Sequence, residues 1–312
     1  CTALETVVIP ASVTSIAADA FQNCEKLTIH GQAGSYAETW AKENNVAYVT
    51  YQNNGDGTCK VSGYSGTCQN LIVSDTAPDG KRITEIGNEA FVGNTNIQTV
   101  KLAPSITKIG ERASSNCSNL ASADLSGVEE IGNGAFKWCN QLESVNLSQN
   151  LKKIGAEAFS SDNKKLNIEI PDSVTEIGRE AFKGCFNLTN VKIPKGLTTL
   201  ESSVFANCSS ITSFEIPETV TKICGAILVC TSVTHVEIPD TVTEINTDSI
   251  FANCKKLESV RLPSCTTEIG SLAFNVCTAL KSVNIPYGVT TIGMRAFGEC
   301  KSLTTIELPE TV

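Results

Sequence analysis

Cysteine is the residue type with the most evident chemical potential in this 312-residue chain, because thiolates bind metals and exchange disulfides. Fourteen cysteines are present, and none forms the C-x-x-C pair of a zinc or redox site. Ten of them close copies of a repeat: Cys1, Cys24, Cys117, Cys139, Cys185, Cys208, Cys230, Cys254, Cys277 and Cys300. In a stack of repeats such thiols would lie about 4.8 Å apart, farther than the roughly 3.5 to 4.5 Å between the Cβ atoms of a disulfide. We therefore expect these ten thiols to be free and buried.

Cys59 and Cys68 stand apart from this series, nine positions from one another in a stretch that resembles a hairpin. Their separation leaves both a local disulfide and two free thiols open. Cys224 and Cys265 fall at a turn and in a loop, and no function is assigned to either.

Catalysis finds little support in the sequence, since the only histidines are His30 and His235 and no nucleophile elbow, H-E-x-x-H, P-loop or dinucleotide motif occurs. The many acidic residues recur at one position of the repeat, as expected for a solvated face. We therefore expect a protein that is not an enzyme and that binds no cofactor or metal.

The charge and hydropathy patterns argue against some classes of binding partner. The formal net charge is -9 and no Lys/Arg cluster interrupts it, which argues against a nucleic-acid partner. No run of 18 apolar residues occurs, so membrane insertion is not expected. Residues 1–10 show no signal peptide, and because the chain starts and stops inside a repeat we expect it to be a fragment of a longer protein.

The repeat determines the expected fold. Residues 255–277 and 278–300 align without a gap, and the central apolar position of each copy recurs every 22 to 24 residues from Val100 to Ile306. Each copy holds a short strand closed by a residue such as Pro263, then a second strand ending at a glycine that would take a positive φ, and then a single helical turn over A-F-x-x-C. One copy cannot fold alone, so the copies must stack into an α/β repeat solenoid of the leucine-rich-repeat type, with a parallel sheet along one side.

Residues 25–82 interrupt the repeat. Ser35 and Glu38 resemble a capping box that opens a helix ending near Glu43, and residues 46–52 and 58–64 alternate as two strands of a hairpin. We interpret the helix and the hairpin as caps, because a stack needs its open ends covered. The expected organisation is a last repeat with its helical C-terminal cap over 1–50, a β-hairpin N-terminal cap over 51–82, and a second solenoid over 83–312, truncated within a repeat.

The recurring I-P-x-x-V-T-x-I-G-x-x-A-F-x-x-C, with the phrase I-H-G-Q-A-G-S-Y-A-E-T-W-A-K-E-N-N over 29–45, resembles the BspA-like leucine-rich repeat family. The resemblance implies a secreted or surface-attached bacterial protein whose partner is a host or bacterial surface protein or a glycan. The sequence departs from the family pattern at several positions. Glu201, Cys224 and Asn246 replace the glycine, Ser114 replaces the phenylalanine, Asp162 replaces the cysteine, and Lys165 stands in place of leucine.

A candidate partner-binding surface follows from strand alternation, because residues between the inward apolar ones point outward. These residues are Lys101, Asp124, Asn146, Glu169, Lys192, Glu215, His235, Glu237, Arg261, Asn284 and Glu307. The face has no aromatic anchor, so a purely solubilising role also fits. The expected function is adhesion or protein recognition; the alternatives are a passive spacer that presents another domain and, third, an intracellular scaffold.

Overall fold

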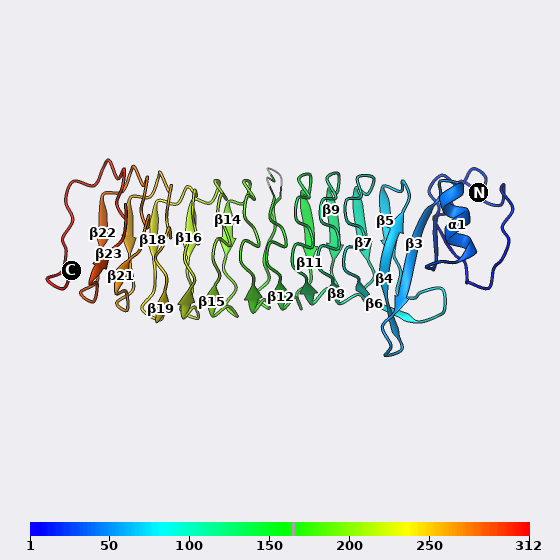
Figure 1. Ribbon diagram of the computed structural model, residues 1–312, viewed down its shortest axis with the longest axis horizontal. Coiled ribbons are helices and arrows are strands. Elements are labelled where there is room, and N and C mark those ends of the chain that lie inside the picture. Colours follow the sequence, from blue (N-terminus) through cyan, green and yellow to red (C-terminus); the bar gives the residue numbers. More distant parts are fainter. Residues whose placement is uncertain (162, 164–165) are drawn as a thin grey trace. The chain divides into compact units, whose positions relative to one another are not determined.

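The computed structural model describes residues 1–161, 163 and 166–312, so the departures at Asp162 and Lys165 lie outside the described residues. The chain forms two compact units, Cys1–Ser148 and Gln149–Val312. In each unit, successive copies of the repeat stack so that their strands pair in parallel, as the rows of arrows in Figure 1 show. The predicted leucine-rich-repeat-type stack is confirmed. In copies that hold both strands, the first strand precedes the proline position and the second strand precedes the glycine position.

In the unit of residues 1–148, the first strands form a four-stranded parallel sheet. Its order is β11 (Ser144–Leu147), β9 (Ser122–Leu125), β7 (Thr99–Leu102) and β5 (Asn70–Val73). Another sheet contains, in order, β1 (Thr6–Val8), β2 (Thr28–Gln32), β3 (Ala47–Asn53), β4 (Thr58–Ser65), β6 (Arg82–Ile86), β8 (Lys108–Ile109) and β10 (Glu130–Ile131). Of these, β6, β8 and β10 are second strands of the repeat. Only β3 and β4 pair antiparallel among these described strands.

In the unit of residues 149–312, the first strands are β14 (Asn190–Lys192), β16 (Ser213–Glu215), β18 (His235–Glu237), β20 (Ser259–Arg261) and β22 (Ser282–Asn284). The second strands are β12 (Lys153–Ile154), β13 (Glu176–Ile177), β15 (Thr199–Leu200), β17 (Lys222–Ile223), β19 (Glu244–Ile245), β21 (Glu268–Ile269) and β23 (Thr291–Ile292). All pairings recorded within this unit are parallel.

The helix and the hairpin lie where the sequence places them. Helix α1 (Tyr36–Glu43) is capped by Ser35, whose hydroxyl accepts from Glu38 N at 3.3 Å, while the Glu38 carboxylate accepts from Gly34 N at 2.6 Å. The apolar face of α1 is buried, and its Trp40 meets the ring of Phe21 edge-on at 5.5 Å. Strands β3 and β4 lie within one residue of the predicted ranges.

The A-F-x-x-C segment is not a helical turn, contrary to the prediction. In the copy of 203–208, Ala206 N and Cys208 N donate to Ser203 O and Phe205 O, but Ser203 and Asn207 have φ of 60° and 62°. In most copies the residue before the segment and the residue before its cysteine are both left-handed, which prevents the chain from continuing as a helix. Helix α1 is the only helix in the described part of the chain.

The prediction for the repeated glycine is also wrong, because these glycines do not adopt a positive φ. A Cβ added at Gly178 would lie 2.4 Å from Ala156 N, and one at Gly293 would lie 2.5 Å from Ser271 N. Both atoms belong to the preceding copy. Glycine is therefore needed for the close approach of two backbones, and the positive φ falls on other residues, such as Glu180 at 56°.

Phenylalanine and cysteine fill the core beneath these segments. The rings of Phe159, Phe182 and Phe205 stack at 5.5 and 5.6 Å. All fourteen cysteines are free, which confirms the expectation for the repeat. The ten thiols that close the repeats are called here the thiol ladder, and six of them are buried. Cys24, Cys230 and Cys300 are half-buried, and Cys1 is exposed. The prediction that all ten are buried is therefore confirmed for six of them and wrong for the exposed Cys1.

Cys59 and Cys68 form no disulfide in this structure. The Cys59 thiol donates to Arg82 O at 3.6 Å, and the Cys68 thiol donates to Asn70 O at 3.2 Å. No helix of the described residues is long and apolar enough to span a bilayer.

Candidate functional site

The candidate surface is the outward side of the first strands, called here the strand face. In β18, Val236 is buried between the exposed His235 and Glu237, as period-two alternation requires. The same alternation gives β16 its buried Phe214 and exposed Glu215. The predicted orientation of these side chains is therefore confirmed.

Strand pairing brings many of the predicted residues together. In residues 1–148, Lys101 pairs in register with Asp124, and Asp124 pairs with Asn146, whose amide donates to the Asp124 carboxylate at 2.8 Å. In residues 149–312, Lys192 pairs with Glu215, and Arg261 lies between Glu237 and Asn284. Glu169 and Glu307 are exposed but lie outside the strands.

Three shallow depressions follow the strand face of residues 149–312. The largest measures about 890 Å³ and brings together five predicted residues: Glu215, His235, Glu237, Arg261 and Asn284. A second, of about 350 Å³, shares Glu215 with it and also includes Lys192. The third, of about 450 Å³, shares Lys192 with the second and includes Glu169. Adjacent depressions thus share lining residues along this face.

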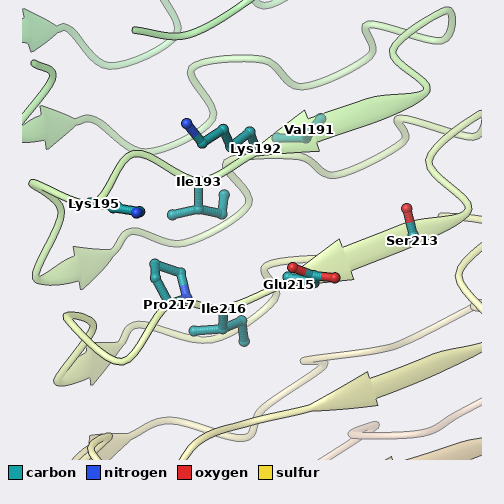
Figure 2. Close-up of a pocket in the computed structure, with 8 residues that line it drawn as sticks. All are labelled: Val191, Lys192, Ile193, Lys195, Ser213, Glu215, Ile216 and Pro217. Atoms are coloured by element: carbon teal, nitrogen blue, oxygen red, sulfur yellow. The ribbon is translucent and has the colours of Figure 1, made fainter. Parts of the chain in front are cut away.

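Figure 2 shows the middle depression. Lys192 comes from β14 and Lys195 from the loop that follows it, whereas Ser213 and Glu215 come from β16. Ile216 and Pro217, which follow β16, also line this depression. Two cations and one carboxylate therefore border the same hollow.

Ion pairs fix the orientation of several charges on this face. Arg261 reaches Glu237 at 3.3 Å and Asp240 at 2.5 Å, and Asp240 also accepts from Ser264 N at 2.7 Å. The hydrogen bond from Ser264 N, followed by the guanidinium of Arg261, lowers the pKa of Asp240 below its ordinary value. Asp240 therefore keeps its negative charge at mildly acidic pH.

Asp172 plays the equivalent part beside Lys192, at 2.6 Å. The hydrogen bond from that ammonium lowers the pKa of the Asp172 carboxyl. Sequence reasoning missed both Asp172 and Asp240, although each directly follows the proline that closes a strand, in I-P-D. That recurring tripeptide was the signal that could have identified them.

The two histidines have different surroundings. His235 is exposed, and its ring accepts from or donates to Thr234 Oγ1 at 3.0 Å. His30 is buried in β2, where Nδ1 contacts the Tyr51 hydroxyl and Nε2 has no hydrogen-bond partner among the described residues. Desolvation by burial lowers the pKa of His30 to about 4. No group of three or more potential metal ligands occurs in the described ranges.

The repeats of this chain match a family described as the BspA type leucine-rich repeat region. The match covers residues 1–34, 68–166, 152–275 and 247–312. The chain belongs to the BspA type leucine-rich repeat family. This confirms the resemblance seen in the sequence motifs.

Solved structures of other bacterial leucine-rich repeat proteins resemble this BspA type chain. A leucine-rich repeat protein from Bacteroides ovatus is 29% identical with a TM-score of 0.58, covering 84% of this chain and 81% of its own. The pneumococcal vaccine antigen PcpA shares the fold at 18% identity, with a TM-score of 0.55 and coverage of 85% and 80%. No curated protein matches the chain.

Proposed function

We propose that this chain is a non-catalytic recognition module of a secreted or surface-attached bacterial protein, and that it binds a protein partner through the strand face of residues 149–312. The observation that carries the proposal is the connected series of depressions lined by Lys192, Glu215, Glu237 and Arg261. A sheet face that is hollowed and charged in both signs offers register and specificity to a protein surface. The family membership supports the bacterial surface location.

The charges available to a partner are not all neutralised within the chain. Arg261 is held by two carboxylates, whereas Glu215 and Glu218 make no ion pair among the described residues. The largest depression therefore carries surplus negative charge. A partner with exposed Lys or Arg side chains fits this surface best.

The experiment compares two charge-reversed double variants in binding to purified host matrix proteins and bacterial surface proteins, measured by biolayer interferometry. E215K/E237K changes the strand face. E244K/E268K makes the same charge change on the second strands, and each pair includes one glutamate that forms an ion pair, Glu237 or Glu244. We expect about tenfold or greater weakening only in the first variant. Equal binding by both variants would contradict this placement.

A spacer role is the second candidate, favoured by ion pairs that join successive copies. Lys153 meets Glu176 at 2.7 Å, and Lys222 meets Glu244 at 2.7 Å. Such pairs between second strands support a stiff stack whether or not a ligand binds. If the unmodified chain binds no member of the panel, the spacer is favoured over the recognition module.

We also propose that α1 closes the repeat of residues 1–50, that the β3–β4 hairpin opens the next array over 51–82, and that the array continues over 83–312. The buried face of α1 supports this division, because Trp40 and Phe21 pack together at 5.5 Å. A chain comprising residues 46–312, which keeps the whole of β3, should then fold alone, with a cooperative thermal transition and the circular dichroism of the strands. Loss of that transition would contradict the boundary.

A further inference from the structure

Trp138 is placed unusually for a tryptophan. It directly precedes Cys139 and has a φ of 61°, a left-handed conformation that bulky side chains rarely adopt. Glycine or asparagine, which adopt it most readily, occupy the equivalent position in six other copies, whereas Val276 and Glu299 occupy it in two. The six are Asn23, Gly93, Asn116, Gly184, Asn207 and Asn253. The Trp138 side chain is also 51% exposed, so packing compensates little for the unfavourable backbone.

One cation lies over this indole, and a second lies in the preceding copy. The ammonium of Lys137 lies 4.7 Å from the ring centroid, within range of a cation–π contact. Arg112 lies in the preceding copy, and Gly134 has no side chain to separate the two cations. A Cβ on Gly134 would lie 3.4 Å from Arg112 Cγ and 3.8 Å from Lys137 Cβ. Arg112 and Lys137 thus border the same bare stretch of backbone.

The surrounding groups are positioned by the fold. Asn116 N donates to Lys137 O at 2.7 Å, which places the exposed Asn116 beside the Lys137–Trp138 segment. Arg112 is oriented by an ion pair with Glu89 at 2.9 Å, while about half of each side chain stays exposed. The indole and the Asn116 side chain are therefore exposed in adjacent copies, with Lys137 over the ring and Arg112 in the copy that also holds Asn116.

We propose that Trp138, Asn116, Lys137 and Arg112 form a binding site for an acidic sugar, a pyranose that carries a carboxylate or a sulfate. The indole would stack on the C–H face of the ring, the Asn116 amide would bind ring hydroxyls, and the Arg112 guanidinium would bind the acidic group, with Lys137 bordering the site. This site lies in residues 1–148 and does not depend on the strand face proposed above. It adds a second ligand class to a chain whose net charge is -9.

A protein partner fits this site less well than a sugar. Protein hot spots are surrounded by contacts that exclude water. The other large exposed apolar residues of this unit are Val8, Tyr36, Ile72 and Val92, and none of them lies in the two copies that supply Arg112 to Trp138. An isolated indole with polar and charged neighbours suits a small ligand.

The test measures fluorescence anisotropy of labelled hexasaccharides added to the full chain. The probes are a heparin-derived sulfated sugar, an oligogalacturonate carrying carboxylates, and neutral maltohexaose. Trp138→Asn is the main variant, because asparagine occupies this left-handed position in other copies and the variant should unfold at the same or a higher temperature. We expect W138N to bind at least one acidic probe about tenfold or more weakly than the unmodified chain does. We expect the unmodified chain not to bind the neutral sugar.

Arg295→Gln is the matched control for Arg112→Gln. Both arginines have a φ of 53° and occupy the same position of the repeat, directly before the alanine. The copy with Arg295 has no exposed tryptophan. We expect R112Q alone to weaken binding, and the preferred acidic probe to show which acidic group is recognised. Unchanged binding in W138N would overturn the proposal. Equal binding of poly-glutamate, or competition by inorganic sulfate at the sugar's own concentration, would also overturn it in favour of nonspecific anion attraction.

Discussion

The thiol of Cys254 donates a hydrogen bond of 2.8 Å to the backbone carbonyl of Leu228 in the preceding copy. Cys277 and Phe251 repeat this relationship at 3.1 Å. Each thiol therefore supplies a donor to a buried carbonyl without the volume of a larger polar side chain. The cysteine of the repeat serves the packing of one copy on the next.

Thiol labelling should distinguish the ladder from the remaining cysteines. Burial raises the pKa of Cys117 and of Cys254 to about 11, so almost no thiolate forms at pH 8. We expect the exposed Cys1 to react quickly with an aromatic disulfide reagent in the native protein, and the buried thiols to react only in guanidinium. Rapid reaction of all fourteen thiols in the native state would contradict the burial of the ladder.

Replacing the repeated glycine should destabilise the stack. An alanine Cβ at position 178 would lie 2.4 Å from a backbone nitrogen, so Gly178→Ala must push two copies apart. We expect a loss of about 1–3 kcal/mol in the free energy of unfolding, measured with urea. Gly288→Ala is the control, because its Cβ would meet nothing closer than 3.4 Å. Equal effects of the two changes would refute the close-approach explanation.

Lowering the pH should decrease the stability of the residue 1–148 unit, because His30 is buried there in its neutral form. Burial lowers its pKa from 6.5 to about 4, so the unfolded chain binds the proton more readily. Stability is therefore lost as the pH falls from 6.5 towards 4, by about 3 kcal/mol for this group. Urea midpoints at pH 7 and pH 4 would measure the loss. His30→Gln should reduce this difference, and an unchanged difference would contradict the role of His30.

The phenylalanine stack should be sensitive to truncation. Phe182 lies between Phe159 and Phe205 and is fully buried, so Phe182→Ala leaves a cavity. We expect a loss of about 3–5 kcal/mol in chemical denaturation. Phe186→Ala, at a half-buried side chain, should cost clearly less. Similar losses for the two variants would mean that the stacked rings contribute no more to the free energy of unfolding than a half-buried phenylalanine does.

The strands and the thiol ladder could be predicted because they depend on period-two alternation and on a fixed repeat. Val236 between His235 and Glu237 is sufficient to orient a strand. The ion pair between Arg261 and Asp240 could not be predicted, since it depends on how a loop of one copy meets a strand of the next.

The glycine prediction failed for a physical reason. A glycine in a turn suggests a positive φ, but at Gly178 the requirement comes from the preceding copy, which the residue's own neighbours in sequence do not reveal. Asn116, Asn207 and Asn253, each just before a cysteine, were the signal for the true left-handed position. Trp138 was overlooked because its significance depends on that conformation.

The burial of the hydrogen-bonded thiols affects whether unfolding of the protein is reversible. While the copies stay stacked, a buried thiol such as Cys208, whose pKa burial raises to about 12, is protected from oxidants without any disulfide. Unfolding would release this whole row at once, with one nucleophile in nearly every copy. In oxidising surroundings random cross-linking would then compete with refolding, so the protein should unfold reversibly with a reductant and irreversibly without one.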